Sequence, residues 1–216
     1  MNINVAGKSF EAGRVFCIGR NYAAHAKELK NDIPDEPVIF CKPPTSLVSH
    51  LQHEIPFPSF GSVLHHEVEI VVLIGKAGKP ESETDALNYI AGLTAGLDLT
   101  MRDVQDDLRK QGLSWEKSKA FDCSAPVGEF TPFTPEQQLA DLCFSCAVNG
   151  VSRQSGNTGN MLFPIPRLIV EISRYWKLLP GDLIFTGTPE GVGPLLRGDC
   201  IEINFAGHNW SWTIQN

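Results

Sequence analysis

The chain has 216 residues, enough for one substantial hydrophobic core or at most two small domains. Its formal net charge of −7 argues against a nucleic-acid backbone as a partner. No apolar run reaches the roughly 18 residues that a membrane span needs, and the N-terminus lacks the basic and apolar regions of a signal peptide. We therefore expect a single cytoplasmic domain, residues 1–216 with its core from about residue 15, and no nucleic-acid or membrane partner.

Short strands joined by tight turns dominate the predicted order of elements. Strands are expected at residues 2–5, 15–18, 38–42, 55–57, 68–74, 93–99, 142–148, 151–154, 183–186, 200–205 and 210–214. Helices are expected at residues 23–30, 84–90, 101–111 and 166–176. Because no regular βαβ repeat appears, this order predicts an α+β fold built on packed mixed sheets.

Two local signals give these elements their expected ends. Thr100 is a candidate N-cap for the third helix, with Asp103 completing a capping box, and Gly112 follows as its C-terminal stop. Asn149-Gly150 separates two strand-like runs and predicts a type I′ hairpin turn.

The most informative segment is residues 64–75, an apolar, β-branched run that carries two carboxylates near its start. Alternate side chains of a strand point to the same face, so Glu67 and Glu69 are expected to lie side by side. Two ionised carboxylates on an apolar strand repel each other and lose hydration unless a cation lies between them. The alternative is the wet end of an edge strand, where glutamate is common.

A third carboxylate occurs in a similar setting, because Asp98 is the one charged residue in the run 90–100. Three carboxylates make a hard, all-oxygen ligand set that suits Mg²⁺, Mn²⁺ or Ca²⁺ and not zinc or copper. Three acids exceed the charge of a divalent ion by one. A nearby cation is therefore expected, and Arg102 and Lys119 are the candidates.

Other polar residues have chemistry that spacing alone leaves open. His25 and Glu28 are three residues apart on a predicted helix, where a carboxylate can orient an imidazole base, although the spacing by itself favours an ordinary surface contact. Arg102 and Gln105 share a helix face that either contacts an anionic substrate or is simply solvated. The loop at Gly187-Thr188 offers N–H groups and a hydroxyl to a carboxylate.

Six segments follow one another in a fixed order from about residue 15 to the C-terminus. They are Gly19-Arg20-Asn21-Tyr22 with His25 and Glu28, Lys42-Pro43, His66-Glu67-Val68-Glu69, Leu97-Asp98-Leu99-Thr100 with Arg102-Asp103-Val104-Gln105, Trp115 with Lys119-Ala120-Phe121, and Thr186-Gly187-Thr188-Pro189-Glu190-Gly191-Val192-Gly193. Together they resemble the fumarylacetoacetate hydrolase family, specifically its small acylpyruvate hydrolase and oxaloacetate decarboxylase branch.

The resemblance implies a fold, a metal and a set of site residues. It implies a mixed β-sandwich roll with a few peripheral helices, a homodimer, and Mg²⁺ or Mn²⁺ bound by the three carboxylates. His25 and Glu28 match the family's lid dyad, which reverses the preference from spacing, and Lys119 matches an active-site lysine. The positions that match substrate contacts are Arg20, Asn21, Arg102, Gln105, Gly187 and Thr188.

The implied activity is metal-dependent hydrolysis of the C–C bond of an acylpyruvate, such as fumarylpyruvate or acetylpyruvate, to pyruvate and a carboxylic acid. His25 would take a proton from the attacking water, and Lys119 would stabilise the oxyanion. Ile18 stands where a further metal-binding aspartate is expected, which argues against fumarylacetoacetate as the substrate.

Three other functions stay open from the sequence. Oxaloacetate decarboxylation passes through the same pyruvate enolate and uses the same 2-oxo acid site. An isomerase or decarboxylase of homoprotocatechuate breakdown is a second alternative within the family. A non-catalytic, Ca²⁺-stabilised β-domain is the alternative from a different class of protein.

Overall fold

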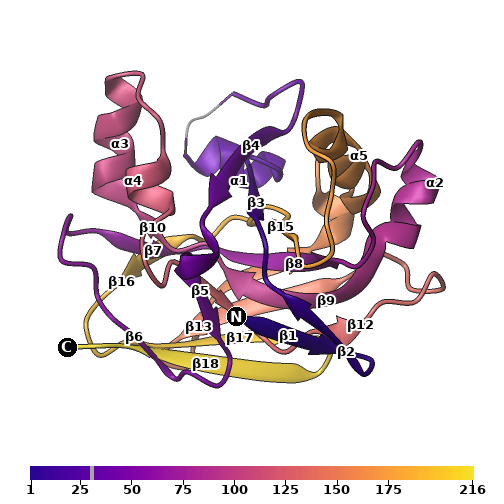
Figure 1. The fold of residues 1–216 in the computed structure, drawn as a ribbon. Helices are drawn as coiled ribbons and strands as arrows, with labels where there is room; N and C mark the ends of the chain where they lie inside the picture. Colours follow the sequence, from indigo (N-terminus) through magenta and orange to yellow (C-terminus); the bar gives the residue numbers. More distant parts are fainter. Residues whose placement is uncertain (30–31) are drawn as a thin grey trace.

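A computed structural model describes residues 1–29 and 32–216 and contains two large mixed sheets with helices on one side (Figure 1). The larger sheet joins strands that lie far apart in the sequence. In spatial order it contains β4 (Val38–Lys42), β3 (Val15–Gly19), β15 (Leu183–Phe185), β8 (Val68–Ile74), β9 (Ile90–Leu97), β11 (Ala125–Val127) and β5 (Leu47–Ser49), with β12 (Thr131–Pro132) paired to β9.

A second large sheet packs against the first, with β13 facing β8 and β17 facing β9. Its spatial order is β14 (Val151–Asn157), β13 (Cys143–Val148), β17 (Cys200–Phe205), β18 (His208–Ile214) and β6 (Glu54–Ile55). Apolar side chains of the facing strands form most of the main core. This two-sheet arrangement with few helices confirms the predicted α+β class.

Smaller elements complete the fold. A three-stranded sheet contains β10 (Thr100–Met101), β7 (Leu64–His66) and β16 (Gly193–Leu195), and a hairpin joins β1 (Asn2–Val5) to β2 (Lys8–Glu11). The helices are α1 (Ala23–Glu28), α2 (Glu83–Ala86), α3 (Arg102–Lys110), α4 (Glu116–Lys119) and α5 (Ile165–Tyr175), with 3-10 turns at Pro44–Ser46, Leu87–Tyr89 and Thr158–Asn160.

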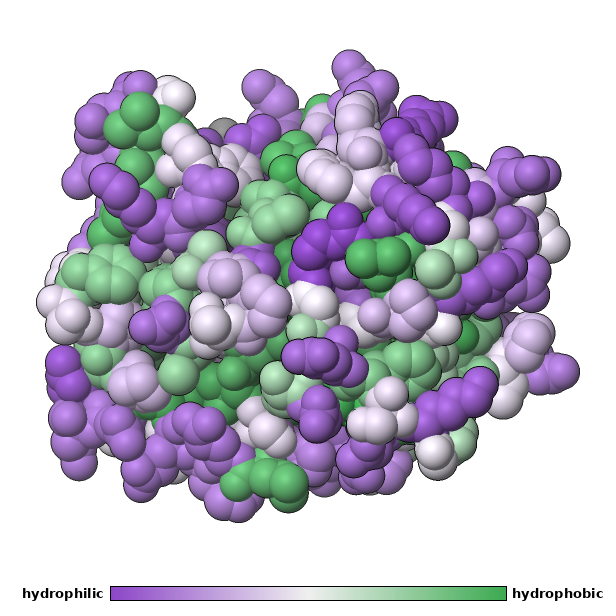
Figure 2. All heavy atoms as spheres, in the orientation of Figure 1, coloured by the Kyte–Doolittle hydropathy of each residue, from purple (hydrophilic) through white to green (hydrophobic). Residues whose placement is uncertain are grey.

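The described part of the chain contains no helix that combines the length and the hydropathy of a membrane span. On the face drawn in Figure 2, hydrophilic side chains interleave with hydrophobic ones.

The helix expected at residues 23–30 is observed as α1, while its last predicted residue, Lys30, lies outside the described residues.

Strand β8 is buried along its whole length, because sheets or helices cover both of its faces. The strand expected at residues 68–74 is thus confirmed as β8, but the wider run 64–75 contains two strands, since β7 and β8 belong to different sheets and Glu67 lies between them. This break places Glu67 at the point where the chain passes from one sheet to the other.

The predicted capping box at the start of α3 is wrong. The N-cap residue is Met101, without a side-chain cap, and the Thr100 hydroxyl donates instead to the Asp98 carbonyl at 3.1 Å. Asp103 accepts hydrogen bonds from the backbone and hydroxyl of Ser62, both at 2.8 Å. Thr100 is held in β10 by pairing with β7, so strand pairing overrides the local capping preference.

The predicted hairpin turn is confirmed, because Asn149 and Gly150 both have positive φ between β13 and β14, as a type I′ turn requires. Gly112 also has positive φ directly beyond α3, in agreement with its predicted role as a stop.

Gly96 lies opposite Glu69 in the β8–β9 pair, and it has no room for a side chain. A Cβ there would come within 2.8 Å of the Pro126 carbonyl oxygen and 2.9 Å of Val71 Cγ2. We expect Gly96→Ala to lower the free energy of unfolding by about 1–3 kcal/mol in urea titrations. Gly193→Ala is the control, because its Cβ meets only His66 at 3.4 Å. Equal effects of the two substitutions would contradict the prediction.

Candidate active site and metal centre

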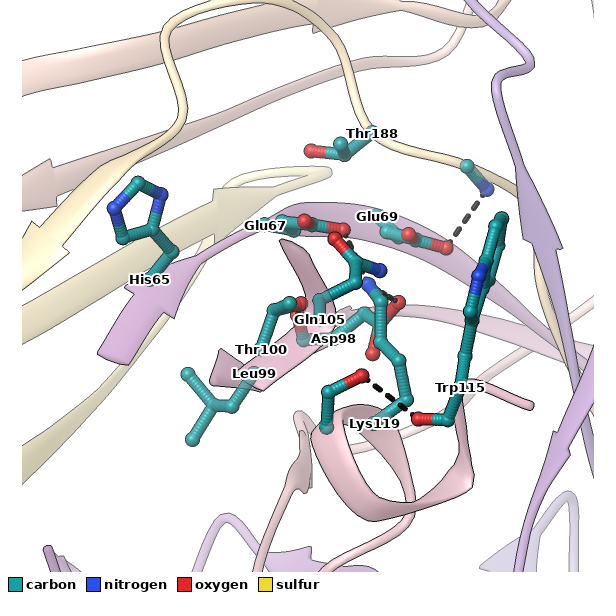
Figure 3. A network of polar contacts seen from close by, with 12 residues as sticks. His65, Glu67, Glu69, Asp98, Leu99, Thr100, Gln105, Trp115, Lys119 and Thr188 are labelled. Carbon is teal, nitrogen blue, oxygen red and sulfur yellow. Dashed lines mark hydrogen bonds and ion pairs between the residues drawn. The ribbon is translucent and has the colours of Figure 1, made fainter. Parts of the chain in front are cut away.

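Three carboxylates converge where β8 begins and β9 ends. Glu67 precedes β8, Glu69 is its second residue, and Asp98 follows β9 directly. A backbone hydrogen bond from Asp98 N to Glu67 O, 2.8 Å long, joins the two segments. One oxygen from each side chain lies within 4.8 Å of the other two, and all three residues are at most 4% exposed (Figure 3). The predicted cluster is therefore present, and it is not the wet end of an edge strand.

Cations surround these carboxylates. Lys119, which reaches up from α4 in Figure 3, places its Nζ 2.8 Å from Glu67 Oε2 and 2.5 Å from Asp98 Oδ2. Arg102 pairs with the other oxygen of Glu67. Both cations expected from the sequence thus neutralise the cluster. Lys42 adds a third positive charge, 2.8 Å from Asp98 Oδ1.

The neutralisation is uneven among the three acids. Burial raises the pKa of Glu69 well above its usual range, and the negative charges of Asp98 and Glu67 raise it further, against the charge of Lys119 and the 2.7 Å hydrogen bond from Gly187 N–H. Burial also acts to raise the pKa of Glu67, but the charges of Lys119 and Arg102 outweigh it, so this pKa is lowered. Glu69 is therefore the acid that most lacks a positive partner.

The arrangement fits a hard divalent cation. Asp98 Oδ1 is buried and accepts no hydrogen bond from the described residues, although Lys42 forms an ion pair with it. A buried carboxylate oxygen without a hydrogen bond and a neighbouring carboxylate with a raised pKa are both relieved by a cation between them. The oxygen ligands match Mg²⁺ or Mn²⁺, and Glu67, Glu69 and Asp98 would hold the ion.

The His25–Glu28 pair is formed in the structure. His25 Nδ1 lies 3.2 Å from Glu28 Oε2, and the imidazole is 5% exposed on the cavity wall. With the Nδ1 proton in this contact, Nε2 is left as the basic nitrogen. Glu28 also accepts a 3.1 Å hydrogen bond from Gly191 N–H, which ties α1 to the loop that carries Thr188.

One cavity combines the carboxylates, the imidazole and several cations. Its lining also includes apolar side chains, among them Ile18, which occupies the position of the expected additional aspartate. The polar and charged lining residues are Arg20, His25, Glu67, Glu69, Asp98, Arg102, Gln105, Arg109, Lys119 and Thr188, and the apolar ones include Ile18, Leu29, Phe40 and Trp115.

Two residues predicted to contact substrate lie outside this lining. The Asn21 amide is completely buried and donates to the carbonyls of Phe163 and Thr186, at 3.1 and 2.8 Å, while its oxygen accepts from Phe163 N–H. Gly187 has positive φ, and its N–H holds Glu69. In this structure both residues support the site instead of facing the cavity.

Sequence reasoning missed Gln154, a buried amide of β14 in the second large sheet. Its Nε2 donates to Thr188 Oγ1 at 2.8 Å, and its Oε1 accepts from Val68 N–H at 3.1 Å. His66 Nδ1 lies 2.9 Å from the same Oε1. Gln154 thereby joins the Thr188 loop to the start of β8. This is a long-range contact, so a local sequence pattern does not predict it.

Comparison with known proteins identifies the family of the chain. A sequence model described as fumarylacetoacetate (FAA) hydrolase C-terminal matches residues 14–209. The chain belongs to this family. The fumarylacetoacetate hydrolase resemblance and its fold, both expected from the motifs, are thereby confirmed.

Individual members of the family resemble the chain along almost its whole length. Oxaloacetate tautomerase YcgM of Escherichia coli (strain K12) is 46% identical, covering 93% of this chain and 91% of that protein. A mitochondrial oxaloacetate decarboxylase of Dictyostelium discoideum is 42% identical, covering 93% and 92%. The crystal structure of fumarylpyruvate hydrolase from Pseudomonas aeruginosa in complex with Mn²⁺ and pyruvate is 36% identical, with a TM-score of 0.93 and coverage of 100% and 95%.

Proposed function

We propose that this protein is a divalent-metal-dependent enzyme that acts on oxaloacetate and interconverts its keto and enol forms. The observation that carries the proposal is the single cavity in which a buried three-carboxylate cluster meets an imidazole base and three arginines. The similarity to an oxaloacetate tautomerase and an oxaloacetate decarboxylase supports this substrate ahead of the acylpyruvate expected from the motifs.

The charge of the cavity suits a small dianion. Arg20, Arg102 and Arg109 all line the cavity with the three carboxylates, and Arg102 pairs with Glu67. Guanidinium groups bind carboxylates through paired hydrogen bonds, so they can hold the two carboxylates of oxaloacetate. A divalent cation, when bound by Glu67, Glu69 and Asp98, supplies Lewis-acid polarisation of the 2-oxo group.

The proton transfer is assigned to His25. Its basic Nε2 takes a proton from C3 of the keto form as the C2–C3 double bond forms, and the developing negative charge collects on the C2 oxygen. Lys119 donates a proton or a hydrogen bond to this oxygen, since its ammonium is buried at the carboxylate cluster. The reverse sequence returns the proton to C3, so the reaction needs no other reactant.

Gln105 is expected to bind an oxygen of the substrate through its amide NH₂. Arg102 donates to Gln105 Oε1, which orients the amide so that its NH₂ group remains available to the cavity. We expect Gln105→Ala to lower kcat/KM about 10²- to 10³-fold, as for the loss of one preorganised donor. Gln111→Ala, at the exposed end of the same helix, is the control. An unchanged kcat/KM in Gln105→Ala would remove Gln105 from the site.

A second candidate function is hydrolysis of an acylpyruvate. It is supported by the His25–Glu28 pair, since an imidazole oriented by a carboxylate can equally activate water, and by the likeness to fumarylpyruvate hydrolase. Water would add to the C4 carbonyl, and cleavage of the C3–C4 bond would release the pyruvate enolate and a carboxylic acid.

The test measures two reactions on the purified wild-type protein, with Mg²⁺, with Mn²⁺ and with EDTA. The first is the loss of enol absorbance when enol oxaloacetate is added. The second is pyruvate release from oxaloacetate, acetylpyruvate and fumarylpyruvate. Metal-dependent enol conversion without pyruvate supports the tautomerase. Faster pyruvate release from an acylpyruvate would make hydrolysis the principal activity, and no metal-dependent reaction with any compound would overturn the proposal.

A further inference from the structure

Lys42 is a buried charge that lies next to the carboxylate cluster without lining the cavity. It is the last residue of β4 and is 2% exposed. Its Nζ lies 3.0 Å from Ser124 O, 2.9 Å from Ser124 Oγ and 3.3 Å from Leu99 O, and it also donates to Lys119 O. Because Lys42 is absent from the cavity wall, it has no direct access to a substrate.

The contact between Lys42 and Asp98 is electrostatic. An ammonium has three protons, and the carbonyl and hydroxyl acceptors around Nζ are sufficient to engage them. Asp98 Oδ1 lies 2.8 Å from Nζ, in an ion pair between two buried side chains. Lys42 therefore contributes a fixed positive charge to Asp98.

This charge completes a balance around the cluster. Glu67, Glu69 and Asp98 carry three negative charges when ionised, and Lys42, Lys119 and Arg102, which pair with them, carry three positive charges. A divalent cation then leaves the loaded cluster with a net charge of plus two. Without Lys42 the acids would be in excess by one charge, and the loaded cluster would keep only plus one.

We propose that Lys42 sets this balance: its charge weakens the hold of the three carboxylates on the divalent cation and strengthens the hold of the loaded site on a dianionic substrate. The first half concerns the metal alone. The second half rests on the proposed function, since it assumes a substrate with two negative charges.

The test compares neutral and charged replacements of Lys42 in the full chain. After EDTA treatment and removal of the chelator, Mn²⁺ is titrated into Lys42→Gln, Lys42→Met, Lys42→Arg and the wild type, with binding followed by electron paramagnetic resonance. Lys110→Met is the matched control, because the side chain of Lys110 is 75% exposed and pairs with the exposed Asp107. Melting temperatures are measured with and without Mn²⁺, and KM is measured for oxaloacetate.

The neutral variants are expected to bind Mn²⁺ at least about tenfold more tightly than the wild type, because a like charge near the ion has been removed. Their melting temperature without metal should be lower than that of the wild type, and Mn²⁺ should raise it by more than it raises that of the wild type. Their KM for oxaloacetate should increase about tenfold. Lys42→Arg and Lys110→Met should match the wild type in Mn²⁺ affinity.

A merely structural role gives a different pattern. Equal or weaker Mn²⁺ affinity in folded Lys42→Gln and Lys42→Met would overturn the proposal. Variants that fold only when Mn²⁺ is present would support it in its strongest form, whereas variants that fold neither with nor without Mn²⁺ would contradict it. If the wild type does not convert oxaloacetate, the proposed function fails, while the Mn²⁺ titration still decides the role of Lys42.

Discussion

Replacing Glu69 with glutamine is expected to make the metal-free protein more stable while it abolishes metal-dependent activity. Glu69 is buried among two other carboxylates and is compensated by the nearby charge of Lys119 and by a hydrogen bond from Gly187 N–H, which glutamine can still accept. Removing the charge should raise the free energy of unfolding in EDTA by about 1–3 kcal/mol, because a buried charge that lacks a partner is costly. Loss of one metal ligand should lower turnover at least about a thousandfold.

The pH dependence of this effect has a definite sign. Because folding raises the pKa of Glu69 above its unfolded value, the folded state favours the protonated form. The stability that depends on this proton is fully present below the unfolded value of about 4.5 and is lost as the pH rises from there to the folded value. The gain from Glu69→Gln should therefore be small near pH 4 and should grow toward neutral pH.

Urea titrations over a pH series, with EDTA or Mn²⁺, measure these expectations. Mn²⁺ should stabilise the wild type and have little effect on Glu69→Gln. Glu36→Gln, an exposed substitution of the same kind, should change neither stability nor activity. A metal-free Glu69→Gln protein that is less stable than the wild type would contradict the assignment of Glu69 as the least compensated acid.

Replacing His25 with asparagine should lower kcat/KM about 10²- to 10⁴-fold, which is the usual contribution of a general base. Mn²⁺ affinity should stay within about twofold of the wild type, because the imidazole is not one of the three expected ligands. Steady-state kinetics and a Mn²⁺ titration of the same preparation measure both quantities. His53→Asn is the control, since His53 is exposed and remote from the cavity lining.

Glu28→Gln separates the charge of Glu28 from its structural contact. Glutamine can still accept the hydrogen bond from Gly191 N–H, but it cannot stabilise a charged imidazole as a carboxylate does. Its loss of kcat/KM should be smaller than that of His25→Asn. Turnover that survives both substitutions would exclude the pair from catalysis.

Local patterns were enough to predict the central strand, the carboxylate cluster and the Asn149-Gly150 turn. Side chains on a strand alternate between faces, so the spacing of Glu67 and Glu69 predicted that their carboxylates lie together, and they do, although Glu67 lies at the break between β7 and β8. Asn149-Gly150 has similar predictive value, since few residue pairs adopt positive φ twice in succession without strain. The order of the six motifs then indicated the family, and the family indicated the base.

The tertiary structure alone decided how the charges of the site are balanced. Lys42 reaches Asp98, and Gln154 reaches Thr188, from strands that are far from these partners in the chain, and both contacts depend on which sheet those strands join. Long-range contacts also engage the polar atoms of Asn21 and Thr100: the Asn21 amide bonds to the Phe163 and Thr186 backbone, and Thr100 lies in a strand paired with β7. The periodicity of a sequence predicts on which face of a strand a side chain lies. Which residue it contacts on that face depends on segments that are distant in the sequence, so a local pattern cannot predict it.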